Sequence, residues 1–270
     1  ASNVAISIAK MKLKSTIYSV MGLDETHAMA LEFLKRNNVV TAHIKTEKDH
    51  PSSFAAVLNY KGETTQLFSH SKMRYRLPKK LPTTQWMHIS ELGEDYEKLY
   101  KDVITECKKK KIKISLNPGT VQIIERKKEL LDLLKVTEVL FVNMSEARQL
   151  LQVNEETEIH NIIVKLKQLG SNYVVITDGK NGAYAYDGFQ LDYAPAYPAK
   201  FVEATGAGDA FSAGFLGALM HNEHHDEALR WGAINAASVV SYVGPTAGLL
   251  SHLEIKRRCK TRPTYKTKEL

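Results

Sequence analysis

Short apolar runs and amphipathic stretches alternate along the second half of the chain. The apolar runs, which are typical of buried strands, lie at 112–116, 139–142 and 173–177. Between them are segments with the 3.6-residue apolar period of helices, the clearest of which covers 158–170. This alternation predicts an α/β fold with a mostly parallel central sheet and helices on both of its faces.

The first third of the chain has a different pattern. A helical pattern over 1–9 is followed by a strand that starts at 16 and by a helix over 26–37. Short alternating strands come next, and a turn at 61–63 predicts a hairpin between two of them. A peripheral hairpin without a function is one interpretation, and a separate small sheet is the other. We predict an α/β core formed by 1–38 and 71–270, and a small β-hairpin sheet at 39–70.

The composition fits a protein with one large core. Of its 270 residues, 43% are hydrophobic and 25% are charged. The net charge of +7 does not predict nucleic-acid binding, because runs such as 108–111 are typical of solvated helix ends. Cys107 and Cys259 lack the spacing of a disulfide framework or a zinc site, which favours a reducing cytoplasm. No signal peptide and no apolar run of membrane-spanning length occur, so we expect no membrane partner.

The most informative stretch is Glu203–Phe211. Gly206, Ala207 and Gly208 leave their backbone N–H groups open to solvent just before an apolar helical run, which is how helix N-termini bind phosphate. Asp209 follows at once. It is either the N-cap of that helix or a general base that takes a proton from a hydroxyl while the neighbouring amides stabilise phosphoryl charge.

The run Thr205–Phe211, followed by Ala213 and Gly214, resembles the C-terminal signature of the ribokinase-like (PfkB) carbohydrate kinase family. The resemblance implies that Asp209 is the catalytic base, that Gly206 to Gly208 form the anion hole and that Thr205 contacts the nucleotide. The family usually has Asp where this chain has Glu203, and a hydroxyl residue or Pro in place of Ala204. Those two departures concern the monovalent-cation site of some members rather than the base.

Other positions match the family in the expected order. Asn3 resembles the last residue of the family's N-terminal signature, and the resemblance makes it a substrate contact. The glycine pair of that signature would precede residue 1. So would the family's first strand, with its substrate-binding Asp. Asn117, after a strand, is either a turn residue or a phosphate contact. Gly244 lies in a loop that the family places beside the adenine and the cation.

Two further motifs have both a structural and a functional interpretation. Asn143 and Glu146 form either a capping box or the family's Asn-x-x-Glu motif, which handles magnesium and phosphate, with magnesium held through water. Thr177 and Gly179 belong either to an ordinary glycine turn or to the family's nucleotide-binding turn.

The resemblance as a whole implies ATP-dependent, Mg²⁺-assisted phosphoryl transfer to a hydroxyl of a sugar or nucleoside, with a monovalent cation in some members. It also implies that the β-hairpin at 39–70 is a lid over the sugar, and that homodimers pair through this lid. A non-catalytic binding member of the same fold is the alternative. A dinucleotide oxidoreductase is disfavoured, because Gly206 and Gly208 lack the third glycine of that fingerprint and follow no early strand of the chain. The identity of the acceptor stays open.

Overall fold

A computed structural model describes residues 1–60, 63–69 and 71–270. The chain divides into two compact units, which are described separately. Unit 1 comprises Ala1–Lys72, Gly179–Gly182 and Tyr193–Lys268, and unit 2 comprises Met73–Asp178, Ala183–Asp192 and Glu269–Leu270. In the described part of the chain, no helix is both long and apolar enough to span a membrane.

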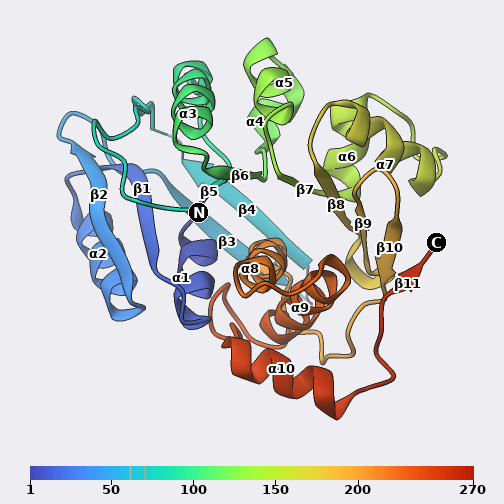
Figure 1. Ribbon diagram of the computed structural model, residues 1–270. Coiled ribbons are helices and arrows are strands. Elements are labelled where there is room, and N and C mark those ends of the chain that lie inside the picture. The colour runs from blue at the N-terminus through green and yellow to red at the C-terminus, as the bar shows by residue number, and fades with distance from the viewer. Residues whose placement is uncertain (61–62, 70) are drawn as a thin grey trace. The chain divides into compact units, whose positions relative to one another are not determined.

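Unit 2 is built on most of a seven-stranded sheet with the order β11-β10-β9-β8-β7-β6-β5 (Figure 1). Strands β5 to β8 pair in parallel, and β9 runs antiparallel to β8. The α/β class and the mostly parallel sheet are therefore confirmed. The elements of this unit and the two strands at its boundary are β5 Trp86–Ile89, α3 Glu97–Lys110, β6 Lys113–Leu116, α4 Thr120–Glu125, α5 Lys128–Leu134, β7 Val139–Asn143, α6 Met144–Leu151, α7 Ile159–Gln168, β8 Tyr173–Thr177, β9 Ala183–Tyr186, β10 Leu191–Ala194 and β11 Lys268–Glu269.

The parallel strands are apolar on both faces because both faces are covered. Four successive residues of β7, Val139 to Val142, are buried, and so are Val174 to Ile176 of β8. Continuous burial of this kind is what parallel sheets require, and it explains why the apolar runs predicted these strands correctly. Two short helices, α4 and α5, connect β6 to β7. Arg126 has φ +45° there, and this left-handed residue separates α4 from α5.

Unit 1 consists of a parallel strand pair, a hairpin and a group of packed helices. Its elements are α1 Ser2–Lys10, β1 Ser15–Gly22, α2 Glu25–Arg36, β2 Val39–Glu47, β3 Phe54–Tyr60, β4 Glu63–Ser69, α8 Ala207–Met220, α9 His225–Val239 and α10 His252–Thr261. Residues far apart in sequence form one apolar cluster, in which Ile6 of α1 and Ala210 of α8 are joined by Ile17, Val39 and Val239. The first turn of α8 is therefore anchored in the core of this unit.

Glycines allow the helices of unit 1 to approach closely. A Cβ on Gly214 of α8 would lie 2.7 Å from the carbonyl oxygen of Trp231 and 2.9 Å from Cα of Gly232 on α9. On α8 too, a Cβ on Gly217 would lie 2.2 Å from Sδ of Met11, the residue that follows α1. Since no larger residue fits either position without movement, α8 packs directly against its two neighbours.

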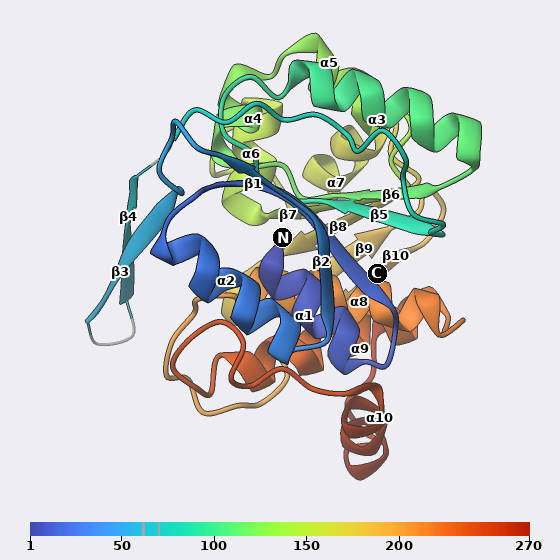
Figure 2. The same ribbon diagram turned by 90° about the vertical axis from the view of Figure 1, so that its left-hand side faces the viewer.

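The predicted hairpin is present. Strands β3 and β4 pair antiparallel and project from the rest of unit 1, as Figure 2 shows. The turn predicted at 61–63 includes residues 61 and 62, which lie outside the described residues. The preceding strand β2 pairs in parallel with β1 instead of with the hairpin. The strands of the predicted lid at 39–70 therefore belong to two different sheets.

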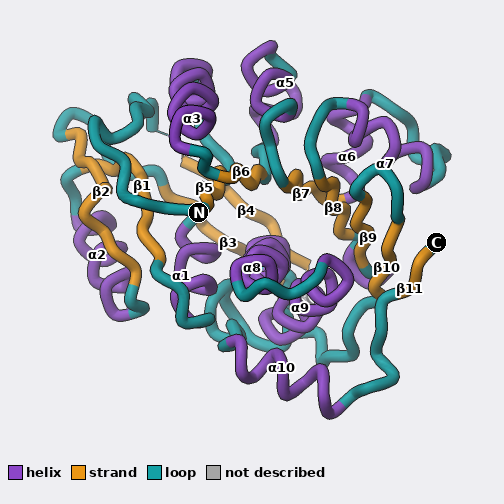
Figure 3. Tube along the Cα trace, viewed as in Figure 1, coloured by secondary structure: helices purple, strands orange, loops and turns teal. Residues whose placement is uncertain are grey.

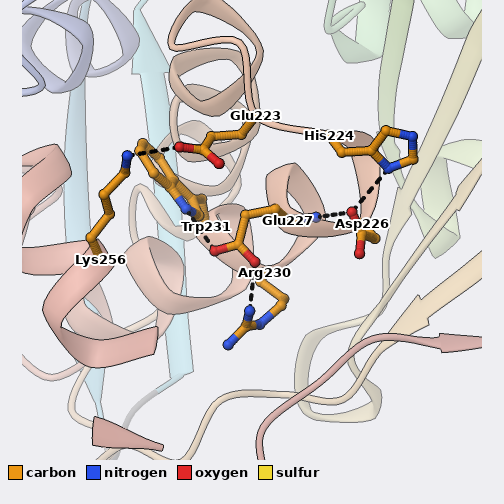
Figure 4. Close-up of polar contacts among 7 residues, drawn as sticks. All are labelled: Glu223, His224, Asp226, Glu227, Arg230, Trp231 and Lys256. Carbon is orange, nitrogen blue, oxygen red and sulfur yellow. Dashed lines mark hydrogen bonds and ion pairs between the residues drawn. The ribbon is translucent and has the colours of Figure 1, made fainter. Parts of the chain in front are cut away.

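The basic C-terminal segment forms helix α10, and Figure 3 shows its place in the chain. It begins at a capping box in which Ser251 and Glu254 satisfy each other's backbone N–H groups. Lys256 attaches it to the turn before α9, where it pairs with Glu223 at 2.8 Å, and to α9 itself, where it lies over the Trp231 ring (Figure 4). Side-chain contacts of this kind leave no periodic signal in the sequence.

Candidate functional site

The helix that carries Asp209 begins with an unusual residue. Its N-cap is Gly206, which has φ +79°, and no described side chain caps the helix. A Cβ on Gly206 would lie 2.5 Å from Cβ of Pro245, so both the backbone conformation and the close contact require glycine. Asp209 is the third helical residue. The interpretation of Asp209 as an N-cap is therefore wrong.

The free amides differ slightly from those predicted. The N–H of Ala207 donates to the carbonyl oxygen of Ala204 at 3.1 Å, so it is already used. The N–H groups of Gly206, Gly208 and Asp209 itself donate to no described residue. Gly208 is exposed, and a Cβ there would meet nothing within 4 Å. Free N–H groups at the positive end of a helix dipole can bind an anion.

Asp209 is held from the opposite end of the sequence. Nδ2 of Asn3, in the first turn of α1, donates to Oδ2 of Asp209 at 2.8 Å. The other carboxylate oxygen, Oδ1, accepts no hydrogen bond from any described residue. The carboxylate is therefore oriented on one side and available to accept a proton on the other. Two of the predicted site residues are thus brought together although 206 positions separate them.

The loops on either side of this centre contact each other. Glu203 is only 4% exposed, and its Oε2 accepts the N–H of Gly244 at 3.1 Å. Gly244 was predicted to contact the nucleotide, and its backbone amide is used in this internal bond. The hydroxyl of Thr205 is buried and has no partner among the described residues. A buried hydroxyl without a hydrogen-bond partner destabilises the protein. Such groups are found at sites where a bound ligand supplies the missing partner.

In unit 2, three predicted residues lie at the carboxyl ends of neighbouring strands. Asn117 follows β6, and its Nδ2 donates to the carbonyl oxygen of Phe141 on β7 at 3.1 Å. Asn143 ends β7 and is paired in register with Thr177, which ends β8. The carboxyl edge of a parallel sheet is where α/β proteins bind ligands. Gly179, two residues after Thr177, is exposed with φ +52° and has open space around it.

Asn143 and Glu146 do form a capping box. Oδ1 of Asn143 accepts the N–H of Glu146 at 2.8 Å, and Oε2 of Glu146 accepts the N–H of Asn143 at 2.9 Å. The pKa of Glu146 is raised, mainly by burial. The hydrogen bond from the N–H of Asn143 opposes this shift, and the nearby charge of Glu91 adds to it. Glu91, just after β5, was missed in the sequence. Its place beyond the end of a strand was the one signal that pointed to it.

A family comparison decides what this arrangement is. The model of the pfkB family carbohydrate kinases matches residues 1–252. The chain belongs to the pfkB family of carbohydrate kinases. The resemblance predicted from the Thr205–Phe211 stretch is confirmed, and with it the class of enzyme.

Curated relatives of this pfkB protein act on different acceptors. It is 28% identical over 171 residues to a cytidine kinase of Thermococcus kodakarensis, a match that covers 62% of this chain and 59% of that enzyme. It is also 25% identical over 259 residues to an ATP-dependent 6-phosphofructokinase of Thermoanaerobacterium thermosaccharolyticum, with 92% of this chain and 80% of the relative covered.

Solved structures confirm the ribokinase-like fold. The Arabidopsis thaliana ribokinase complexed with ribose and ATP matches with a TM-score of 0.81 and 20% identity, over 95% of this chain and 85% of that one. An E. coli protein in complex with ATP and Mg²⁺ matches with a TM-score of 0.80 and 18% identity, over 96% and 87%. At identities of 18% and 20%, these matches show only the fold of the pfkB protein and not its substrate.

A cavity elsewhere in unit 1 does not coincide with this centre. It has a volume of about 330 Å³ and is lined by Ala9, Lys10, Lys12, Arg36, Asn37, Asn38, Ser251 and Glu254. Its cations have a structural explanation. Lys10 and Arg36 lie in the last turns of α1 and α2, where cations stabilise a helix, and Nζ of Lys10 donates to the carbonyl oxygen of Leu249. We therefore place the candidate site at Asp209 and not in this cavity.

Proposed function

We propose that the protein transfers the γ-phosphoryl group of ATP to a hydroxyl group of a sugar or a nucleoside, with Asp209 as the general base. The hydrogen bond from Asn3 to Asp209, next to unused amides at the start of α8, is the observation that carries this proposal. A base must have a fixed orientation and a free lone pair, and this carboxylate has both.

The chain's own groups have distinct roles in this step. Asn3 holds Oδ2, so that Oδ1 faces the acceptor hydroxyl and removes its proton. The N–H groups of Gly206, Gly208 and Asp209 stabilise the negative charge on the transferring phosphoryl group. The free amides refine the predicted anion hole, because the N–H of Ala207 donates within the loop.

Unit 2 supplies the proposed contacts to nucleotide phosphates and to Mg²⁺. Glu146 keeps one carboxylate oxygen outside its capping box, and Glu91 adds a second negative charge nearby. Hard oxygen donors of this kind suit Mg²⁺, which keeps several waters and binds through one or two carboxylates. When bound, the ion neutralises phosphate charge. Asn143 is proposed to act with Glu146 on Mg²⁺, through water. The proposed nucleotide contacts are Asn117 and Thr177 in unit 2, and Gly179, Thr205 and Gly244 in unit 1.

The acceptor class follows from the family only in outline, as a sugar or nucleoside. The test is a coupled assay of ADP release with a panel that includes ribose, fructose, fructose 6-phosphate, a keto-deoxy sugar acid and cytidine, each in K⁺ and in Na⁺ buffer. We expect one acceptor to give ADP and phosphorylated product in equal amounts. ATP binding without transfer to any member of the panel would instead favour a non-catalytic ligand-binding role.

The hairpin is the proposed lid and the proposed dimer contact. Phe54, Leu58 and Leu67 share one face of the β3–β4 pair and are 59%, 59% and 57% exposed. An apolar face this exposed favours a partner. If it covers the acceptor, Leu58→Glu should raise the KM of the acceptor and leave the KM of ATP unchanged. If it joins two copies, the same variant should be a monomer under conditions in which the parent is a dimer by light scattering.

A further inference from the structure

One fully buried amide connects three segments of unit 1. Asn235 lies in the middle of α9 and is 0% exposed. Its Nδ2 donates to the carbonyl oxygen of Ala210 at 2.7 Å and to Oγ of Ser7 at 3.1 Å, while its Oδ1 accepts the N–H of Leu250 at 3.0 Å. A buried amide is expensive unless it is hydrogen-bonded, and this one uses both of its N–H groups and its oxygen.

The partners of Asn235 are neighbours of the proposed catalytic pair. Ala210 follows Asp209 in the first turn of α8 and is buried in the core of the unit. Ser7 is four residues beyond Asn3 on α1, so the two side chains lie on the same face of that helix one turn apart. Asn235 therefore bonds to both helices that meet in the contact between Asn3 and Asp209.

The packing around Asn235 fixes the distance between the helices and not their positions along their axes. The contacts of Gly214 with Gly232 and of Gly217 with Met11 bring α8 close to α9 and to α1. Contacts between small residues set the spacing of helices and allow sliding along their axes. The directional bonds of Asn235 resist such sliding, because each has a preferred length and angle.

We propose that Asn235 is a positioning residue, which holds α1 and α8 in the register that lets Asn3 orient Asp209. This inference rests on the proposed function, since it assigns Asp209 the role of base. Asn235 does not touch the reacting atoms in this assignment. A displacement of about 1 Å at a catalytic group can lower turnover by about 10²-fold, so a loss of register should appear mainly in kcat.

The test uses the full chain and three variants. Asn235→Leu has nearly the same size and removes all the hydrogen bonds, and Ser7→Ala removes one of them. Thr137→Val is the control, because Thr137 of unit 2 is buried and its hydroxyl bonds to the carbonyl oxygen of Leu133, far in sequence from the pair. Each is measured alone and combined with Asn3→Ala, by steady-state kinetics and by hydrogen exchange of backbone amides.

We expect Asn235→Leu to lower kcat at least tenfold and to change the KM of ATP by no more than about twofold. In the Asn3→Ala background, Asn235→Leu should cause no further decrease in kcat. If the decreases in kcat of Asn235→Leu and Asn3→Ala multiply in the double variant, the proposal is wrong. It is also wrong if Asn235→Leu and Thr137→Val lower kcat equally when their decreases in Tm are the same. If Asn235→Leu does not fold, Ser7→Ala gives the same comparison with a smaller effect.

Hydrogen exchange separates this proposal from the proposed function. Peptides covering α1 and the first turn of α8 should exchange faster in Asn235→Leu, whereas peptides covering β7 and β8 should not change. This readout needs no turnover. A parent protein that phosphorylates no acceptor would contradict the proposed function alone, and unchanged exchange at both helices would contradict the role of Asn235 alone.

Discussion

Asn3 and Asp209 are joined by a 2.8 Å hydrogen bond from Nδ2 to Oδ2, across 206 residues of sequence. The bond places a residue predicted to bind substrate against the residue predicted to be the base. An amide N–H donates a hydrogen bond but does not give up its proton to a carboxylate, so this contact orients Asp209 without transferring a proton to it. Its geometry leaves the second oxygen of the carboxylate for the acceptor.

Removal of Asn3 should therefore impair the reaction more than the fold. Asn3 is only half-buried, so Asn3→Ala should change the stability little, while loss of a hydrogen bond to a charged group, worth about 1.5–3 kcal/mol, should lower kcat/KM by about tenfold or more. Ser2→Ala, at the exposed neighbouring position, is the matched control. Equal kinetics for the two variants would show that Asn3 does not act on the base.

The two glycines of the anion loop should respond in opposite ways. Gly206→Ala combines a positive φ with contact against Pro245 and should destabilise the protein by roughly 1 kcal/mol or more. Gly208→Ala has free space and ordinary helical geometry, so its stability should be unchanged or higher. Its methyl group would nevertheless stand beside the unused amides, and we expect a large loss of turnover.

Thermal unfolding and kinetics of both glycine variants check this prediction. Normal turnover in Gly208→Ala would mean that no phosphoryl group approaches those amides. A Gly206→Ala variant as stable as the parent would show that the loop can move away from Pro245.

Most of the strands, and the presence of free N–H groups at the start of α8, could be predicted from sequence. Buried parallel strands such as 139–142 are uniformly apolar, and the Gly206 to Asp209 run has few purely structural uses. Even there, the sequence could not tell an N-cap from a residue in the first turn, because that depends on the left-handed conformation of Gly206. The internal bond of Ala207 was hidden for the same reason.

Other features depend on contacts that sequence patterns do not encode. Asn235 looks like one more polar residue in an Ala-rich helix until its three partners are known. Helix α10 depends on its capping box, on the ion pair with Glu223 before α9 and on the contact of Lys256 with Trp231 of α9. The roles of Asn117, Asn143, Glu146, Thr177, Gly179 and Gly244 stay predictions, as does the lid at 39–70.

The turn after β1 should make stability depend on acid pH. Asp24 accepts the N–H and the hydroxyl of Ser52 and the N–H of His27, and these bonds, led by the Ser52 N–H, lower the pKa of Asp24. A carboxyl group with a lower pKa in the folded state stabilises the fold above its unfolded pKa of about 3.9, and this stabilisation is lost as pH falls through the folded pKa.

Urea unfolding between about pH 5 and pH 2.5 measures this dependence. The loss of stability of Asp24→Asn on acidification should be smaller than that of the parent. Glu156→Gln, at an exposed loop position, is the charge-matched control. The same acid dependence in the parent and in Asp24→Asn would exclude this carboxylate as its source.

Two acidic residues near α10, Glu227 and Glu223, should stabilise the protein to different extents (Figure 4). Glu227→Ala leaves the buried N–H of Trp231, which donates to Oε1 of Glu227 at 3.1 Å, without a partner, and should cost about 1–3 kcal/mol. Glu223→Ala removes only a partly exposed ion pair with Lys256 and should cost less than about 1 kcal/mol.

The reactivity of Cys259 gives a second readout of the same region. Burial, with the charge of Glu227 next, raises the pKa of the Cys259 thiol to about 12, so its thiolate is rare near neutral pH. Glu227→Ala should therefore speed its modification by a disulfide reagent, as followed by mass spectrometry. Unchanged labelling, together with unchanged stability, would contradict this account of the α9–α10 contact.

The central claim is that the carboxylate of Asp209 removes the acceptor proton. The most direct test measures ATP binding and steady-state turnover of Asp209→Asn, which keeps the size of the side chain and loses its basicity. We expect nearly unchanged ATP affinity and a decrease in kcat of about 10²-fold or more, the usual contribution of a general base. An Asp209→Asn variant that turns over as fast as the parent would contradict it.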